Sequence, residues 1–482
     1  MRYVTPMPVS AAYAPDPMFS DLGEEFADVV APATFPERRL RWRNQRWAEA
    51  VGLGALNDAE FEAAFARFAP LPDNLPAPLA IRYHGHQFRV YNPDLGDGRG
   101  FLFAQVRDGH GRLLDLATKG SGQTPYSRAG DGRLTLKGGM REILAATMLE
   151  AQGVYTSKAF ALFETGERLQ RSDEPSPTRA SVLTRLSHGH VRFGVFQRHA
   201  YHERPDLLRR LIDYCGAAFY PHLLNTPDAE RPAALLQAVV DASARLAGQW
   251  MAAGFVHGVL NTDNLTVTGE SFDYGPWRFL PTSTPGFTAA YFDQTGLYAF
   301  GRQPEAVGWA LSQLAGALTL VSETAPLEAA LRSYATAYQR GLRDAVFTRL
   351  GLTTGPLEAD LALLQDFFSW LTQSQAPWGQ VFHDWMCGAA SAARAADSPI
   401  ADLYADAAFT PIRAGLEARA PARPERLATP YFERPTPPDL LIETVEALWA
   451  PIASSDDWSA FDAKIADIDT MRAALDIAAP AA

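Results

Sequence analysis

The segment that says most about this chain is a polar run within an apolar region, His257-Gly258-Val259-Leu260-Asn261-Thr262-Asp263-Asn264. Nine residues after Asn264 comes a second short motif, Asp273-Tyr274-Gly275. Asn264 and Asp273 carry hard oxygen atoms, which Mg²⁺ and Mn²⁺ use as ligands when they also contact nucleotide phosphates. An Asp–Asn pair in a loop is otherwise an Asx turn or a helix cap. The two motifs therefore need support from the rest of the chain.

The spacing of these motifs is similar to that of a protein kinase active site. Kinases place the catalytic-loop Asp five residues before a metal-binding Asn, and a metal-binding Asp-Phe-Gly follows. By this spacing Asn264 and Asp273 match the two metal ligands, whereas Val259 stands where the catalytic base would be. Valine cannot accept a proton. The pattern predicts a site that keeps the metal ligands but lacks the usual base.

The composition is that of an ordinary globular protein. The chain has 482 residues, of which 47% are hydrophobic and 20% are charged. A chain of this length can form about three domains and bury a large core. Its net charge of -12 disfavours nonspecific attraction to nucleic acid or to an anionic membrane. We therefore expect neither as a partner, and any phosphate site must be a local group of basic residues.

Cysteine usage and the start of the chain favour a cytoplasmic location. The two cysteines, Cys215 and Cys387, lie far apart and do not form the pattern of a zinc site or a disulfide framework. Residues Met1 to Pro15 lack a positively charged start followed by an apolar run, so they do not resemble a secretory signal. A reducing cytoplasm is the simplest interpretation.

The hydrophobic pattern predicts a β-rich part followed by a helical part. Alternation and glycine-rich turns predict strands at 89–91, 95–100, 101–106, 113–119, 159–163 and 181–186. Helical spacing predicts helices at 44–51, 134–152, 206–219, 231–253 and 304–321. This layout predicts an α+β, protein-kinase-like bilobal fold. Its expected parts are an N-terminal extension (1–75), a β-rich N-lobe (76–203), a helical C-lobe (204–388) and a C-terminal extension (389–482).

Three features of the β-rich part favour a nucleotide site. The glycines of Gly96–Gly100 would let backbone amides approach a phosphate, although a Gly-Asp-Gly segment is more often a simple turn. Lys119 ends a predicted strand, where a kinase carries its phosphate-binding lysine; otherwise it is an exposed strand-end residue. Glu142 has small apolar neighbours on its helix, and a carboxylate buried among them needs a cation. We predict an ion pair with Lys119, whereas an exposed Glu142 would simply be solvated.

Two arginines, Arg185 and Arg192, follow the second group of predicted strands. The guanidinium group recognises phosphate through two parallel hydrogen bonds. Ion pairing with acidic surface residues is the commoner role of an arginine. Both interpretations are open on the sequence.

A longer set of motifs resembles the selenoprotein O family. The motifs occur in family order over roughly residues 40 to 325, and they are 83–88, 95–99, 119–128, 131–133, 141–142, 185–194, 257–265 and 273–276. One departure is Arg89, which stands where the family has glycine. Members of the family are kinase-like proteins that move AMP from ATP to Ser, Thr or Tyr hydroxyls of proteins.

The resemblance implies a nucleotide bound in the reverse of the kinase orientation, with its γ-phosphate buried and its α-phosphate facing the acceptor. The resemblance also implies that Asp263 accepts the proton and that Mg²⁺ (or Mn²⁺) is held by Asn264 and Asp273. Nucleotide contacts are implied for Gly96, Gly98, Arg99, Lys119, Asp131, Gly132, Arg185, Arg192 and Asp273.

Two other functions fit the same motifs. Ordinary phosphate transfer could use Asp263 as its base, and a nucleotide-binding scaffold without catalysis could sense ATP. Loss of a metal ligand would favour the scaffold, but both Asn264 and Asp273 are present. The leading hypothesis is an ATP-dependent protein adenylyltransferase that acts on protein substrates.

Overall fold

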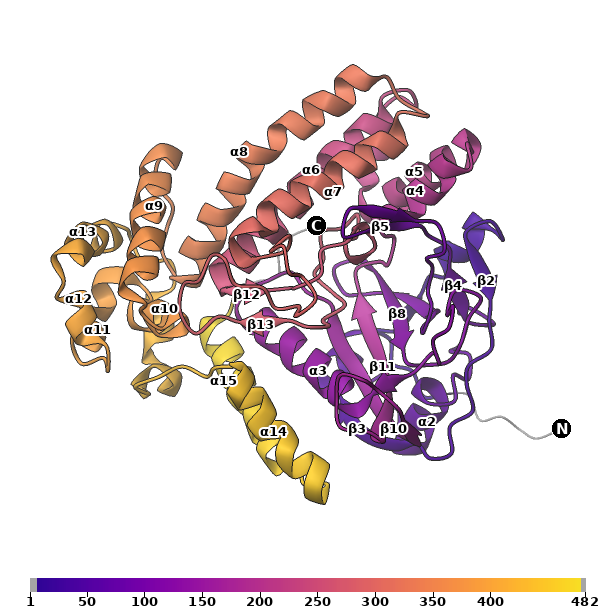
Figure 1. Cartoon of the computed structure of the whole chain (residues 1–482), viewed down its shortest axis with the longest axis horizontal. Helices are drawn as coiled ribbons and strands as arrows, with labels where there is room; N and C mark the ends of the chain where they lie inside the picture. Colours follow the sequence, from indigo (N-terminus) through magenta and orange to yellow (C-terminus); the bar gives the residue numbers. More distant parts are fainter. Residues whose placement is uncertain (1–6, 478–482) are drawn as a thin grey trace.

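The strands and helices of this chain follow one another in a mixed α+β order (Figure 1). The computed structural model describes residues 7–477, so residues 1–6 and 478–482, the outer ends of the expected extensions, lie outside the described part. An antiparallel sheet occupies the N-terminal half, and helices make up most of the chain beyond it. The predicted α+β class is confirmed.

The main sheet is antiparallel in all its pairings. Its central strands are β7 (Leu102–Arg107), β8 (Leu113–Lys119), β11 (Thr178–Ser187) and β10 (Lys158–Leu169), side by side in that order. Short strands β1 (Ala14–Pro15) and β9 (Leu134–Thr135) pair with β7 and β11. Arg185 on β11 lies opposite Ala117 on β8, and Lys119 lies opposite Leu183. Because residues two apart share a face, Lys119 and Arg185 project from the same face.

Short strands from within or just after the first 75 residues form the two edges of the main sheet. Strand β2 (Ala27–Val29) pairs with β4 (Leu79–Ile81) at one edge, and β3 (Arg39–Arg43) pairs with β10 at the other. The segment expected as an extension therefore belongs to the main sheet. Short strands like these are hard to recognise from the sequence, because three to five residues carry little alternation.

Around the glycine-rich loop, the strand predicted at 95–100 is wrong and the strand predicted at 89–91 is displaced by one residue. Residues 95–100 form a loop whose one β contact is an isolated bridge from Gly96 to Arg82. Phe88 and Arg89 both have positive φ, which makes them the turn between β5 (Gly85–Gln87) and β6 (Val90–Asn92). A two-residue hairpin turn favours positive φ at both positions because its twist then matches that of the strands. Arg89 therefore precedes the strand that was expected to contain it.

The two faces of the sheet pack against different helices. One face contacts α1 (Gln45–Ala50) and α2 (Asp58–Phe65) through a cluster that includes Phe61, Phe65 and Phe160. The other face contacts α3 (Leu136–Ala151), in a cluster with Leu144, Leu162 and Leu183. Lys119 lies on the α3 face because it pairs with Leu183 across the strands. The sheet register thus aims Lys119 at the helix that carries Glu142.

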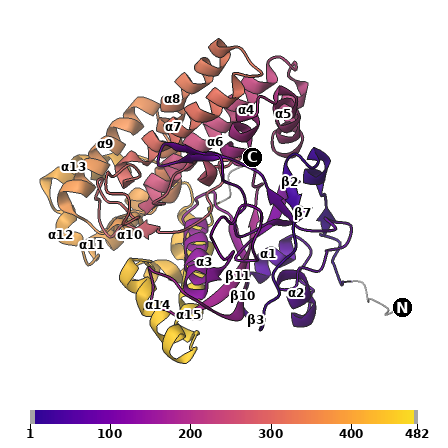
Figure 2. The same ribbon diagram turned by 45° about the vertical axis from the view of Figure 1, so that its right-hand side comes forward.

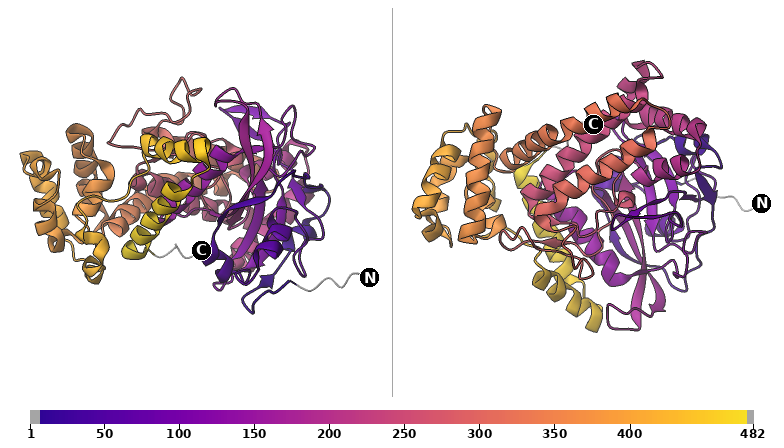
Figure 3. Two further views of the ribbon diagram at one scale, coloured as in Figure 1. Left: turned by 90° about the horizontal axis from the view of Figure 1, so that it is seen from below. Right: turned by 45° about the horizontal axis from the view of Figure 1, so that its top comes forward.

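The rest of the chain is mainly helical, and the predicted helices near 206–219, 231–253 and 304–321 are confirmed. The longest helices, α6 (Arg231–Ala253) and α8 (Thr324–Arg349), run side by side (Figure 3). Before the polar run come α4 (Phe193–Tyr201) and α5 (Pro205–Phe219), and after it come α7 (Gln303–Leu318), α9 (Leu357–Ser374), α10 (Trp378–Asp384), α11 (Ala392–Ala396), α12 (Ala401–Tyr404) and α13 (Thr410–Glu417). No helix within residues 7–477 is long and apolar enough to cross a membrane.

The last two helices return to the sheet end of the molecule. Helix α15 (Ser459–Leu475) lies beside α3, and α14 (Ile442–Ser455) packs against α15, as Figure 2 shows. The turn between them carries Asp456, whose carboxylate accepts hydrogen bonds from Arg41 on β3 at 2.8 Å and from Arg179 on β11 at 2.6 Å. Helix α3 is therefore enclosed between the sheet and the end of the chain.

Candidate active site

A cavity of about 380 Å³ opens between the glycine-rich loop, strands β8 and β11, and the segment around residues 263–273. Its lining contains Asp263 and all nine residues expected to contact the nucleotide. These nine are Gly96, Gly98, Arg99, Lys119, Asp131, Gly132, Arg185, Arg192 and Asp273. Residues from Gly96 to Asp273, far apart in the chain, therefore meet at one cavity.

Lys119 connects the sheet, α3 and the second motif. Its Nζ forms ion pairs with Glu142 and with Asp273 Oδ1, the latter at 2.5 Å. Lys119 and Glu142 are 5% and 2% exposed, so their charges need one another. Burial opposes the charged form of Asp273, but Lys119 and Arg185 outweigh it and hold the pKa of Asp273 well below its usual value. Asp273 is a carboxylate at neutral pH.

The two expected metal ligands are neighbours. Asn264 ends a single 3₁₀ turn (Thr262–Asn264), and its Nδ2 donates to Asp273 Oδ2 at 2.9 Å. His257 lies at hydrogen-bond distance from the carbonyl of Phe272, 2.9 Å from Nε2, and so ties the polar run to the residue before Asp273. Within residues 7–477 no group of three or more His, Cys, Asp or Glu side chains could hold a metal ion. An amide and a carboxylate fit a Mg²⁺ that takes its other ligands from phosphate and water.

Asp263 is the acidic group of the cavity without a strong partner. Its Oδ1 is buried and accepts no hydrogen bond within the described residues. Burial raises the pKa of Asp263 to about 6, although Arg192 opposes the shift. A carboxylate oxygen in this position can accept a proton from a group that enters the cavity.

The two arginines suggested by the sequence both turn toward the acidic groups of the site. Arg185 Nη1 lies 3.4 Å from Asp273 Oδ1 and 3.9 Å from Glu142 Oε2. Arg192 Nη1 donates to Asp97 Oδ1 at 3.0 Å, and both arginines are less than 10% exposed. Buried guanidinium groups beside a cavity are suited to hold phosphate.

Sequence reasoning missed Asp97, which orients Arg192. The other Asp97 carboxylate oxygen accepts from the backbone amide of Ile81 at 3.1 Å, so the side chain is fixed from both ends. Asp97 stands between two glycines that were singled out for their backbone alone. An acidic residue inside a phosphate-binding loop is unexpected, and this was the signal that could have revealed its structural role.

The glycine-rich loop rests on the segment that follows β8. Thr124 Oγ1 and Ser127 Oγ donate to the carbonyls of Asp97 and Gly98, each at 2.5 Å. A Cβ at Gly96 would lie 2.2 Å from the ring of Tyr126, so a larger residue would push the loop away. Asp131 pairs with Arg171 at 2.8 Å at the cavity wall. Tyr126, Ser127, Arg128, Arg133 and Arg171 also line the cavity, and none of them was proposed as a site residue.

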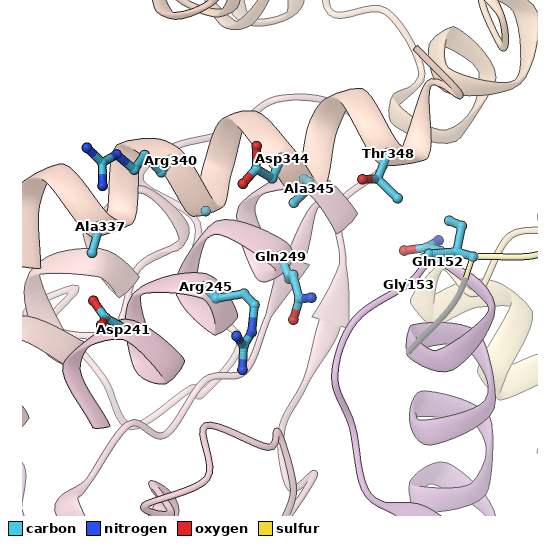
Figure 4. Close-up of a pocket in the computed structure, with 13 residues that line it drawn as sticks. Gln152, Gly153, Asp241, Arg245, Gln249, Ala337, Arg340, Asp344, Ala345 and Thr348 are labelled. Carbon is cyan, nitrogen blue, oxygen red and sulfur yellow. The ribbon is translucent and has the colours of Figure 1, made fainter. Parts of the chain in front are cut away.

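Another cavity, of about 440 Å³, lies between α6, α8 and the end of α3 (Figure 4). Its polar side chains include Arg245, Gln249, Arg340 and Asp344. Among the described residues that line it, none is a site residue expected from the sequence. Both cavities have charged linings, and it is the cavity of about 380 Å³ that brings the expected site residues together.

Comparison with known proteins agrees with the motif set. The family model described as "Protein adenylyltransferase SelO" matches residues 9–469. A protein of Gloeobacter violaceus, "Protein nucleotidyltransferase YdiU", is 43% identical over 460 residues, which cover 92% of this chain and 93% of the relative. A protein of Synechococcus elongatus with the same name is 49% identical over 352 residues, 72% of this chain and 70% of the relative. The chain thus belongs to the SelO family of protein adenylyltransferases, which are nucleotidyltransferase enzymes.

Proposed function

We propose that this enzyme transfers AMP from ATP to Ser, Thr or Tyr hydroxyls of protein substrates, with the γ-phosphate directed inward. The single observation that carries the proposal is the polarity of the cavity. Its lining has Lys119 and Arg185 around Asp273, and it also has Asp263, whose Oδ1 has no hydrogen-bond partner within residues 7–477. This arrangement supports an anionic polyphosphate at the basic side and an acceptor hydroxyl beside Asp263.

A kinase-like bilobal arrangement belongs to the same proposal. The ion pair from a strand lysine, Lys119, to a helix glutamate, Glu142, supports it, as do Asn264 and Asp273 side by side. We keep 76–203 and 204–388 as the two lobes, with residues 1–75 and 389–482 as additions to them. Two buried, unpaired cysteines support action in a reducing cytoplasm.

In the proposed reaction each residue has a separate task. Asp263 accepts the proton of the acceptor hydroxyl as its oxygen attacks the α-phosphorus. Lys119, Arg185 and Arg192 stabilise the negative charge that gathers on the departing pyrophosphate. Mg²⁺ (or Mn²⁺), held by Asn264 and Asp273, would supply further positive charge beside the phosphate oxygens. The glycine-rich loop holds the nucleotide in place.

The acceptor residues provide the test of this proposal. The full-length protein is incubated with ATP, Mg²⁺ and a mixture of candidate proteins, and modified peptides are sequenced by mass spectrometry. We expect AMP on Ser, Thr or Tyr side chains, and no modification with Asp273→Ala, whose fold is checked by circular dichroism. AMP on other side chains, or an unchanged yield with Asp273→Ala, would contradict the assignment.

A further inference from the structure

A second basic cavity lies next to the proposed nucleotide cavity. It measures about 440 Å³ and is bounded by α3, the segment 274–292 and the start of α14. Four basic side chains line both cavities, and they are Arg99, Lys119, Arg133 and Arg171. The two cavities are therefore adjacent, and positively charged side chains form the wall between them.

The two cavities differ in the acidic groups that they contain. The acidic residues of the first cavity are Asp97, Asp131, Asp263 and Asp273, whereas those of the second are Glu142, the buried partner of Lys119, and Asp173, Glu174 and Glu446. The second cavity thus lies on the Lys119 side of the site, away from Asp263. In the orientation proposed above, this is the side of the β- and γ-phosphates.

Two arginines of the second cavity, Arg141 and Arg278, have no carboxylate at ion-pair distance within residues 7–477, although Glu446 attracts both from further away. Arg141 donates to the carbonyl of Trp277 at 3.2 Å, and Arg278 donates to the same carbonyl at 2.8 Å. In the described part of the chain neither guanidinium forms an ion pair within 4 Å. Glu446, an acidic residue of the same lining, is occupied by Lys137 at 2.8 Å.

The two guanidinium groups are close enough to repel one another. Burial and the charge of Arg278 lower the pKa of Arg141 to about 10. Two guanidinium groups that contact the same carbonyl repel one another, and an anion bound between them would relieve this repulsion. A guanidinium has five donors, and the backbone carbonyls that these two arginines contact do not use them all.

We propose that the second cavity binds inorganic pyrophosphate, the leaving group, with Arg141 and Arg278 as its ligands. The inference rests on the proposed function. In that reaction the acceptor oxygen forms a bond to the α-phosphorus, and the bond from the α-phosphorus to the bridging oxygen breaks. The electron pair leaves with pyrophosphate, and the proton passes to Asp263. Pyrophosphate then lies on the Lys119 side of the new AMP ester. The basic residues that line both cavities allow it to move from the first cavity into the second.

The proposal predicts that pyrophosphate affinity and ATP affinity respond to different residues. Pyrophosphate is titrated calorimetrically into the full-length protein and into Arg141→Gln and Arg278→Gln. Each loses at least one charge-assisted contact, so we expect pyrophosphate to bind about tenfold more weakly. ATP affinity, governed by the first cavity, is expected to stay unchanged.

Matched variants test whether the effect is specific to Arg141 and Arg278. Arg340→Gln removes an arginine from the cavity between α6 and α8 and should leave pyrophosphate affinity unchanged. Arg278→Lys keeps the charge and should restore part of the affinity. Arg141 also lies over the ring of Trp277 at 4.7 Å, so thermal unfolding must show that its variant is folded. Arg278→Gln gives an answer that does not depend on this stacking.

Two results would overturn the inference. The first is unchanged pyrophosphate affinity in both Arg141→Gln and Arg278→Gln, which would place pyrophosphate outside the second cavity. The second is an equal loss of ATP affinity, which would mean that these arginines bind ATP itself and form no separate pyrophosphate site. The adenylyl-transfer assay with wild-type protein reports separately on the proposed function. Normal transfer with unchanged pyrophosphate binding rejects the second cavity alone. Selective weakening without any transfer upholds the pyrophosphate site and rejects the proposed function.

Discussion

At the scale of single residues, two acidic side chains of the cavity differ in the partners that surround them. Asp273 is held as a carboxylate by Lys119 and Arg185, whereas Asp263 Oδ1 has no hydrogen-bond partner within residues 7–477. Groups with such different environments serve different tasks in an active site. We assign charge and metal binding to Asp273, and proton acceptance to Asp263.

Asp263→Asn should separate proton acceptance from nucleotide binding. The amide keeps the size of the side chain but cannot take the proton, so we expect the rate of transfer to fall about 100-fold or more. ATP affinity should not change. Labelled transfer and calorimetry measure the two quantities, with Asp241→Asn, at the cavity between α6 and α8, as the control. A rate close to that of the wild type would remove Asp263 from the mechanism.

The buried pair of Lys119 and Glu142 should show strong coupling. Removing Lys119 alone leaves Glu142 and Asp273 with only the more distant Arg185 as a cation, and breaking a buried pair in this way typically destabilises by about 3–5 kcal/mol. Lys119→Met should therefore lower the free energy of unfolding and weaken ATP binding. The double variant with Glu142→Met should recover part of the stability but not the ATP affinity. Urea unfolding of the wild type, Lys119→Met, Glu142→Met and the double variant tests this cycle. Additive losses of unfolding free energy would mean that the pair is not coupled.

Glu270 predicts a pH dependence of stability. Burial raises the pKa of Glu270 to about 7, although Lys158 opposes the shift. In the unfolded chain a glutamate has a pKa of about 4.3, so between these values the folded protein binds the extra proton. Stability should fall as pH rises through this range, by on the order of 3 kcal/mol from this group.

Glu270→Gln is the matched variant for this prediction. The glutamine oxygen can still accept from the His188 amide, now 2.7 Å from Glu270 Oε2, and it does not titrate. Urea unfolding at about pH 5 and about pH 8 should show a smaller difference for the variant than for the wild type. Equal differences would show that Glu270 does not carry the effect.

At the scale of elements, the sequence predicts long helices and central strands better than short edge strands. The helices α5, α6 and α7 were predicted close to their observed bounds because each spans several turns of regular spacing. Strands β2 and β3 have three and five residues, and they are defined by partners elsewhere in the chain. The segment 95–100 is a loop and not a strand, and its Gly96 and Gly98 adjoin Tyr126, a contact that the sequence does not reveal.

The same distinction applies to the site. The spacing of the motifs predicts that Lys119, Asn264 and Asp273 belong to the site, because a kinase active site carries such residues in a fixed order along the chain. Asp97, Tyr126 and Arg171 depend on how the loops fold over one another, so local pattern cannot identify them. The sequence therefore predicts the residues to which we assign the chemistry, and the structure adds residues that contact and position them.

Strand β3 supplies a prediction at this scale. Its Arg41 contacts Glu164 Oε2 at 2.5 Å and Asp456 at 2.8 Å, so β3, β10 and the turn between α14 and α15 are joined. Removing residues 1–43 deletes both β2 and β3 and exposes the two edges of the sheet. We expect the shortened protein to lose its cooperative thermal unfolding, followed by circular dichroism. A midpoint equal to that of the full chain would show that the first 43 residues are dispensable for the fold.

At the scale of the whole molecule, the enzyme encloses a basic centre in an acidic protein. The net charge is -12, yet Arg99, Lys119, Arg185 and Arg192 converge on one cavity. The sheet supplies Lys119 and Arg185, α3 supplies Glu142, and the loops before the later helices supply Asp263 and Asp273. Strands and helices thus have to pack together before the site exists, which explains why its chemistry depends on the complete fold.

The central claim is that AMP, and not phosphate, leaves the nucleotide. It is tested most directly by incubating the full-length protein with Mg²⁺ and ATP labelled at either the α- or the γ-phosphate and by measuring the label that becomes bound to protein. The reversed nucleotide predicts bound label from α-labelled ATP and none from γ-labelled ATP. Label transferred from the γ-phosphate alone would contradict the account and indicate ordinary phosphate transfer.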